Sequence, residues 1–180
     1  MEYYTLKLCG VTRRLPIVSL GPKLKIASFN LLGDSELVVK AAEALEKKIK
    51  DLDFDYLVGP EVKVVPLLQV LAQMLGKPRY IILRKHIMGY MTKPVSNKSK
   101  PNLVLNGPDA EILQGRKVII VDDVISTGRT IRVVKELMSL AGAEVIGIIA
   151  VLKQGDVQEE IDMPFVFLGT LPVFQNQTDS

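Results

Sequence analysis

The stretch KVIIVDDVISTGRT, residues 117–130, combines an apolar run with a polar loop and decides the fold class. Its first five residues predict a buried strand, because an unbroken β-branched run is typical of a parallel sheet covered on both faces. Asp122 and Asp123 then stand side by side, where two carboxylates repel each other and suit neither a strand interior nor a helix core. We therefore expect the pair at the carboxyl end of the strand, where open parallel sheets bind ligands.

The residues after the aspartates form a small, hydroxyl-rich loop. Ser126, Thr127, Gly128, Arg129 and Thr130 lead directly into a helix predicted over 130–142. Backbone N–H groups, hydroxyls and the helix dipole converge at such a point, which favours a phosphate. The carboxylates would then accept hydrogen bonds from the vicinal hydroxyls of a sugar that carries this phosphate. The chain contains neither G-x-x-x-x-G-K-[ST] nor G-x-G-x-x-G.

Strand and helix patterns alternate along the rest of the chain. Helical periodicity and end signals predict helices over 35–52 and 66–75, and apolar runs predict strands over 54–58, 79–84, 144–152 and 164–169. The first helix should bury Val38, Ala41, Leu45, Ile49 and Leu52. Residues 86–108 predict a long loop with room for an edge hairpin. The fold class is α/β, an open and mostly parallel sheet with helices on both faces.

Bulk composition sets wide limits. With 180 residues, 48% of them hydrophobic, the chain suits a single domain with a substantial core, and a net charge of +3 gives no general case for nucleic acid. The single cysteine, Cys9, favours a reducing cytoplasm. We expect no secretory signal and no membrane span, because no apolar run approaches about 18 residues.

Charge is unevenly distributed. No acidic residue occurs from Val62 to Pro108, a span that holds the bases Lys63, Lys77, Arg79, Arg84, Lys85, Lys93, Lys98 and Lys100. Such a region is either a solvated basic face or the binding surface of an anionic partner, and the charge pattern leaves both open.

The central stretch resembles the phosphoribosyl pyrophosphate signature of type I phosphoribosyltransferases, in which apolar residues, two acids and a T-G-x-T loop follow one another. LVGPEVKVVP, residues 57–66, resembles the pyrophosphate-binding GPEARG loop of adenine phosphoribosyltransferases, with Lys63 in place of the arginine. LRKHIMGY, from residue 83, resembles the VRK segment of that family, and FNLLGD, residues 29–34, is a weaker echo.

The resemblance implies a site. Glu61, Val62, Lys63, Arg84 and Lys85 would bind or stabilise the departing pyrophosphate, and Asp122 and Asp123 would bind the ribose and Mg²⁺. The 5′-phosphate would lie in the loop formed by Val124, Ile125, Ser126, Thr127, Gly128, Arg129 and Thr130. It also implies a hood from about 1–34 and 160–180, a flexible loop over about 86–108, and a homodimer.

The base-binding part departs from the adenine family. The flexible loop lacks that family's glutamate, and IASF, residues 26–29, lacks its arginine and acid. Phe29 and Asn30 are therefore the candidates for contacting the base, and Phe29 is equally suited to the apolar core. His86 could move a proton, or lie on the surface without such a role. Arg129 resembles the loop ending of hypoxanthine and guanine enzymes.

These observations predict a purine phosphoribosyltransferase of purine salvage, with phosphoribosyl pyrophosphate and a nucleobase as its ligands and adenine as the first candidate base. Hypoxanthine, guanine or xanthine is the alternative. A second alternative is a non-catalytic sensor of phosphoribosyl pyrophosphate that binds nucleic acid, although no helix-turn-helix pattern occurs in the first 50 residues.

Overall fold

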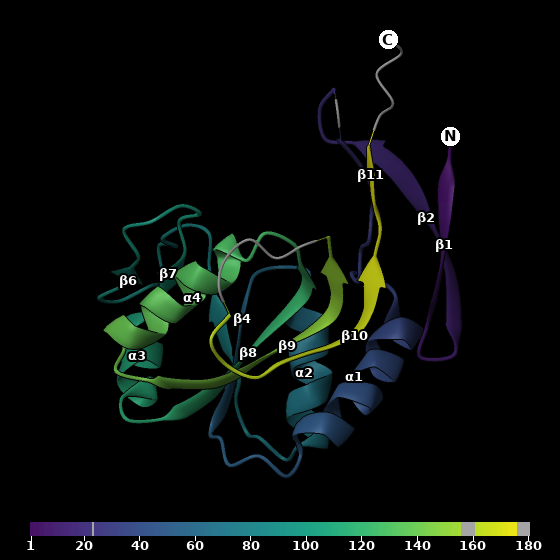
Figure 1. Cartoon of the computed structure of the whole chain (residues 1–180). Helices are drawn as coiled ribbons and strands as arrows, with labels where there is room; N and C mark the ends of the chain where they lie inside the picture. Colours follow the sequence, from purple (N-terminus) through teal and green to yellow (C-terminus); the bar gives the residue numbers. More distant parts are fainter. Residues whose placement is uncertain (23, 156–160, 176–180) are drawn as a thin grey trace.

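A five-stranded parallel sheet forms the centre of the molecule (Figure 1). The computed structural model describes residues 1–22, 24–155 and 161–175. The strand order is β10-β9-β8-β4-β5, and all four neighbouring pairs are parallel. The strands are β4 (Tyr56–Pro60), β5 (Ile81–Leu83), β8 (Lys117–Ile125), β9 (Glu144–Gln154) and β10 (Phe165–Leu171). The predicted parallel α/β sheet is confirmed.

Helices cover both faces of this sheet, as predicted. One apolar core lies between the sheet and α1 (Ser35–Ile49) with α2 (Val65–Met74), and the other between the sheet and α4 (Arg129–Leu140) with α3 (Gly107–Leu113). Successive residues of β8 alternate between the two cores: Ile119 packs in the first and Ile120 in the second. This two-sided burial explains the unbroken apolar run in the sequence.

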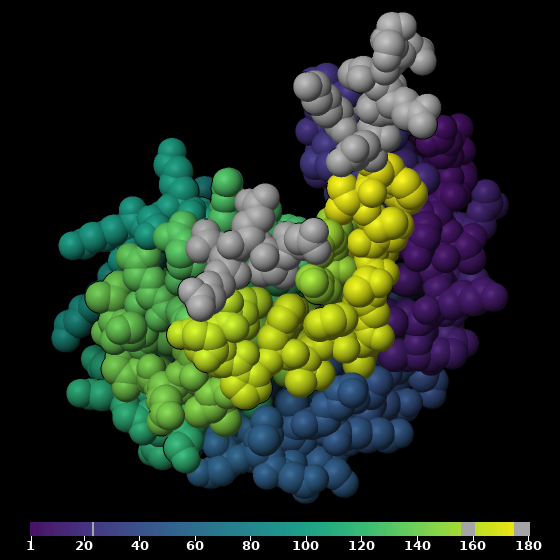
Figure 2. Space-filling view, in the orientation of Figure 1, coloured from purple at the N-terminus to yellow at the C-terminus, as the bar shows by residue number. Residues whose placement is uncertain are grey.

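The hood is a separate antiparallel sheet that rises beside the main one (Figures 1 and 2). Its order is β1-β2-β3-β11, built from β1 (Tyr3–Leu8), β2 (Val11–Ser19), β3 (Leu24–Ala27) and β11 (Val173–Gln175). The Arg13 guanidinium of β2 reaches both Asp34 oxygens, at 2.7 and 2.9 Å, and Glu36 at 2.7 Å. The hood is thereby tied to the start of α1.

The C-terminal part of the hood is narrower than the expected 160–180. β10 belongs to the main sheet, and among the described residues only β11 joins the hood from this end of the chain. Residues 156–160 and 176–180 lie outside the described ranges.

A short hairpin lies within the predicted long loop. β6 (Val95–Ser96) pairs with β7 (Val104–Leu105), and Arg84 and Val104 exchange two backbone hydrogen bonds of 2.8 and 2.7 Å. The edge hairpin is therefore confirmed. The loop ends earlier than predicted, because α3 begins at Gly107 with Pro108 in its first turn, a position that proline favours.

Two boundaries differ from the sequence expectation in ways that matter. α1 ends at Ile49, and Leu52, expected in its buried stripe, is 46% exposed. β8 continues to Ile125, so Asp122 and Asp123 lie inside a strand and not after it. The expectation that a strand would end before the pair was wrong. In the described ranges, no helix is long and apolar enough to cross a membrane.

Candidate functional site

The candidate site is a cavity of about 520 Å³ at the carboxyl ends of β4, β5 and β8. Parallel strands present their ligand-binding loops at this edge. The cavity is lined by Pro60, Glu61, Val62, Lys63, Val64, Lys85, His86, Pro101, Asn102, Leu103, Asp122, Asp123, Val124 and Thr130. Two ammonium groups, of Lys63 and Lys85, and three carboxyl groups, of Glu61, Asp122 and Asp123, thus share one cavity, although they come from three separate parts of the sequence.

The two aspartates are buried in β8 at the floor of this cavity. Asp122 is 7% exposed and Asp123 is 9% exposed, and the backbone N–H of Asp123 donates to Oδ1 of Asp122 at 2.8 Å. Burial, and then repulsion from Asp123, raises the pKa of Asp122 well above the ordinary carboxyl value, while the positive charge of Lys63 acts in the opposite direction. A strand interior holds an acid pair only at a cost, which indicates that the pair serves a ligand.

The predicted phosphate loop forms its own small cavity beside the larger one. Its walls are Asp122 and every residue from Val124 to Ile131, so the whole predicted loop lies around one point. Gly128 caps α4 with a left-handed backbone, φ +87°, which favours glycine there. The Thr127 hydroxyl accepts from the N–H of Arg129 at 3.5 Å. The positive end of the α4 dipole, which lies at this loop, suits an anion.

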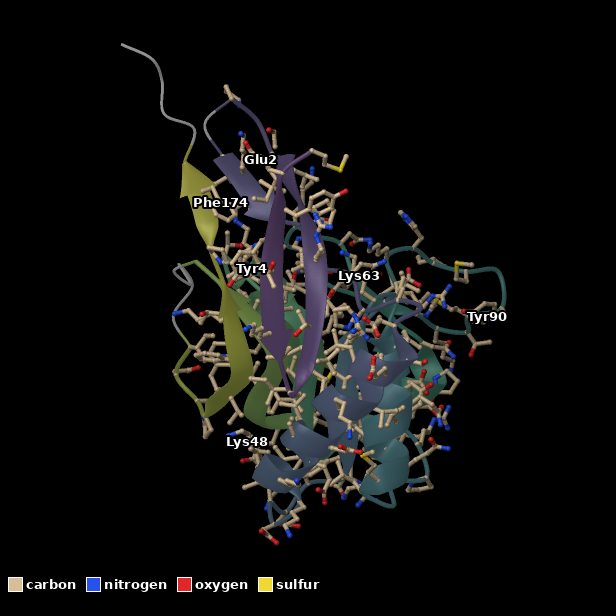
Figure 3. The ribbon with its side chains drawn as sticks, turned by 90° about the vertical axis from the view of Figure 1, so that its right-hand side faces the viewer. Glu2, Tyr4, Lys48, Lys63, Tyr90 and Phe174 are labelled. Atoms are coloured by element: carbon tan, nitrogen blue, oxygen red, sulfur yellow. The ribbon has the colours of Figure 1, made fainter. Side chains whose placement is uncertain are left out.

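Lys63 connects the end of β4 to the hood side of the molecule. Its Nζ donates to the backbone carbonyl of Phe29 at 3.3 Å (Figure 3). The ammonium therefore stands at the cavity with a fixed partner from a segment 34 residues earlier in the chain.

Glu61 organises the opposite wall. Its Oε1 accepts from the backbone N–H of Lys85 at 2.7 Å, and its Oε2 lies 2.7 Å from Nε of Arg84. That Arg84 N–H makes no well-aligned hydrogen bond in the described structure, so the contact with Glu61 is an ion pair and little more. Glu61 thus fixes the end of β5 beside the end of β4, and Lys85, which follows β5, lines the cavity at this junction.

Most predicted site residues come together, and three do not line either cavity. Arg84 is engaged by Glu61. Phe29 is 5% exposed and packs in the core, and Asn30 accepts through its side chain from the N–H of Leu32 at 3.3 Å. The role of Phe29 and Asn30 at a base stays a prediction. His86 does line the larger cavity.

The resemblance placed the loop 86–108 over the ligand, but the sequence analysis did not name the residues of this loop that form one wall of the cavity. Pro101, Asn102 and Leu103 line it from the stretch predicted as loop. A loop without periodicity gives no signal of where it packs, and this one is placed by the backbone pairing of Arg84 with Val104. Pro60 and Val64 also line the cavity; both lie within the GPEARG-like stretch 57–66, although the sequence analysis did not name them as site residues.

The residues present fit a magnesium ion that arrives with a phosphorylated ligand. Within the described ranges no three His, Cys, Asp or Glu side chains gather as a metal site. Asp122 and Asp123 supply carboxylate oxygens, and Mg²⁺ commonly takes one or two carboxylates, waters and substrate phosphates. The donor set therefore suits a shared ion better than a protein-enclosed one.

Two relatives of known name each match about two thirds of the chain or more. A hypoxanthine/guanine phosphoribosyltransferase from Methanothermococcus okinawensis is 35% identical over 136 residues, 72% of this chain and 70% of the relative. An adenine phosphoribosyltransferase from Petrotoga mobilis is 33% identical over 122 residues, 66% of this chain and 69% of the relative.

Solved structures share the fold. Adenine phosphoribosyltransferase from Thermoanaerobacter pseudethanolicus superposes with a TM-score of 0.73 at 24% identity, covering 87% of this chain and 95% of that one. The sequence pattern of the phosphoribosyl transferase domain matches residues 30–179, most of the chain. The chain therefore belongs to the phosphoribosyltransferase family.

Proposed function

We propose that this enzyme transfers the phosphoribosyl group of phosphoribosyl pyrophosphate to a 6-oxopurine, hypoxanthine or guanine, with release of pyrophosphate. The observation that supports the chemistry is the shared cavity, which Lys63 and Lys85 line together with the buried pair Asp122 and Asp123, beside the phosphate loop. The curated relative with 35% identity is a hypoxanthine/guanine enzyme, which supports the choice of base.

The proposed reaction uses the three parts of the site separately. The loop Val124–Thr130 binds the 5′-phosphate, and Asp122 and Asp123 accept hydrogen bonds from the ribose hydroxyls. Departure of pyrophosphate leaves positive charge on the ribose and adds negative charge to the leaving group. Lys63 and Lys85 stabilise that anion, and the purine nitrogen attacks the opposite face of C1. The purine gives up its ring N–H proton to water in this step. Bound Mg²⁺ would neutralise phosphate charge during this step.

Adenine, which the sequence analysis gave as the first candidate base, is here the second candidate. The Petrotoga mobilis relative supports it. The likeness to adenine enzymes among solved structures at 24% identity supports only the fold. The homodimer, the cytoplasmic location and the flexibility of residues 86–108 stay predictions. A non-catalytic sensor would bind phosphoribosyl pyrophosphate with the same groups, so the cavity does not separate it from an enzyme; the relatives, both named phosphoribosyltransferases, favour the enzyme.

The test is pyrophosphate release from phosphoribosyl pyrophosphate and Mg²⁺ with hypoxanthine, guanine, xanthine, adenine, uracil and orotate offered separately. We expect release with hypoxanthine or guanine. Release with adenine alone would reverse the choice of base. Failure of every base to cause pyrophosphate release would contradict the proposed reaction. The variant Asp122→Asn/Asp123→Asn, which keeps the side-chain shape, should remove activity and still fold.

A further inference from the structure

Residues 98 and 99 of the β6–β7 segment are held on α4 by a single carboxylate. Oε1 of Glu136 accepts from the backbone N–H of Lys98 at 2.9 Å, and Oε2 accepts from the hydroxyl of Ser99 at 2.7 Å. Both bonds lower the pKa of Glu136, so the carboxylate is charged at neutral pH. The span Val62–Pro108 has no acid of its own, and α4 supplies one to it.

The attached segment behaves as one unit around Asn97. This side chain is buried; its Oδ1 accepts from the N–H of Leu103 at 2.7 Å, and its Nδ2 donates to the carbonyl of Pro101 at 3.1 Å and to that of Ser99. These bonds join the attachment point at Ser99 to Pro101 and Leu103. A displacement of residues 98–99 would therefore be passed to the wall of the cavity.

The attachment also connects that wall to the phosphate loop. α4 begins at Arg129, directly after Gly128, and Glu136 lies about two helical turns further along. Pro101, Asn102 and Leu103 line the cavity at one side, and Thr130 of α4 lines it at another. Figure 1 shows β6 and β7 beside α4. One helix thus begins at the phosphate loop and also holds the segment that carries Pro101, Asn102 and Leu103.

We infer that Glu136 is a positioning residue, which holds the wall Pro101–Leu103 over the cavity so that a pyrophosphate group is bound there. The inference rests on the proposed function for the identity of the ligand. Glu136 does not line either cavity and so acts only through the segment. Its loss should loosen the segment and weaken pyrophosphate binding, while α4 stays folded because Glu136 is not part of its apolar face.

Limited trypsin digestion measures the attachment without using activity. Lys93 and Lys100 each precede a proline, which trypsin does not cut, so the cut between Lys98 and Ser99 reports on the attachment point itself. We expect Glu136→Ala to speed this cut about tenfold and Ser99→Ala about threefold, because the first removes two hydrogen bonds and the second removes one. Ser99→Thr, which keeps the hydroxyl, should restore the slow cut.

Calorimetry with inorganic pyrophosphate and Mg²⁺ measures the positioning. Glu136→Ala should raise the Kd about fivefold, Ser99→Thr should bind as the unchanged protein does, and Glu111→Ala on the exposed side of α3 is the matched control. Faster cutting with an unchanged Kd would show an attachment that positions nothing, and an unchanged cutting rate would show no attachment. Either result would overturn the inference. Absence of turnover with every base would count against the proposed function alone.

Discussion

Asp122 and Asp123 bring two carboxyl groups into a part of β8 that solvent barely reaches. Such a pair destabilises an ordinary strand, because each carboxylate loses its hydration and repels the other carboxylate. Its presence next to Lys63 and the phosphate loop is consistent with a site that tolerates instability for ligand binding. The same fact predicts an unusual dependence of stability on pH.

Asp122→Asn should raise stability at neutral pH. Because the pKa of Asp122 is raised in the folded state, the folded protein binds a proton that the unfolded chain has released, and stability from this group falls as the pH rises above about 4. The variant removes that loss. Melting temperatures of the two proteins should coincide near pH 3.5 and diverge, with the variant higher, toward pH 7. Asp51→Asn, at an exposed position, is the control; parallel curves for Asp122→Asn would contradict the assigned burial.

Gln154 is a buried polar residue whose side-chain amide lacks a complete set of hydrogen-bond partners in the described part of the chain. It is 9% exposed at the end of β9, and its Nε2 has no hydrogen-bond partner within the described structure. Replacing an unpaired buried donor with an apolar side chain of similar size should stabilise the protein, by about 1–3 kcal/mol. Urea unfolding of Gln154→Leu measures this, with the exposed Gln73→Leu as control. Lower stability would show that the amide is paired in the folded protein.

At the scale of elements, the sequence patterns predicted the helices and strands that depend on interactions between residues close together in the chain. The stripe Val38, Ala41, Leu45 and Ile49 is buried in α1 as expected, and Asp34 caps this helix by accepting from the N–H of Leu37 at 3.1 Å. The apolar run of β8 was predicted for the same reason, but the C-terminal boundary of this strand was not. The strand continues through the aspartates because Asp122 still pairs with Ala150 of the neighbouring strand β9.

The hood strands were beyond such patterns. β11 pairs with β3, with Val173 opposite Ile26, and nothing near Val173 in the sequence indicates a partner so distant. β2 contains Pro16, which reads as a strand breaker, although it lies in the middle of the strand. The site followed the same rule: motif residues at strand ends were found, and the wall Pro101–Leu103, placed by long-range contacts, was not.

Gly59 tests how closely β4 must approach its neighbours to place the GPE loop. A Cβ at this position would lie 2.7 Å from the Val121 carbonyl oxygen and 2.9 Å from Cδ1 of Leu68. Neither a sheet carbonyl nor a buried leucine between α2 and the sheet can move freely, so Gly59→Ala should cost about 1–3 kcal/mol of folding free energy. Gly89→Ala, where no atom lies within 4 Å of the added carbon, should be close to neutral in the same denaturation experiment. Equal stability of the two variants would show that β4 can shift away from β8.

For the whole molecule, the contact between Lys63 and Phe29 is the direct link from the cavity to the hood side of the chain. The ammonium contacts a carbonyl of the segment predicted to reach the base and also faces the cavity proposed for pyrophosphate. Lys85 faces the same cavity from the end of β5 and is positioned by Glu61 instead. The two lysines therefore offer a matched pair with similar charge and different connections.

Lys63→Met should weaken the binding of both pyrophosphate and the purine base, whereas Lys85→Met should weaken only that of pyrophosphate. Each variant loses a positive charge at the cavity and should raise the Kd of pyrophosphate about tenfold, equivalent to about 1.4 kcal/mol. Lys63→Met also releases the Phe29 carbonyl, so the KM for the purine base should rise, whereas Lys85→Met should leave that KM unchanged. Steady-state kinetics with the base varied at saturating phosphoribosyl pyrophosphate separates the two effects. If both variants changed the KM for the base equally, the two ligands would be coupled through charge in the cavity, and the contact with Phe29 would have no part in that coupling.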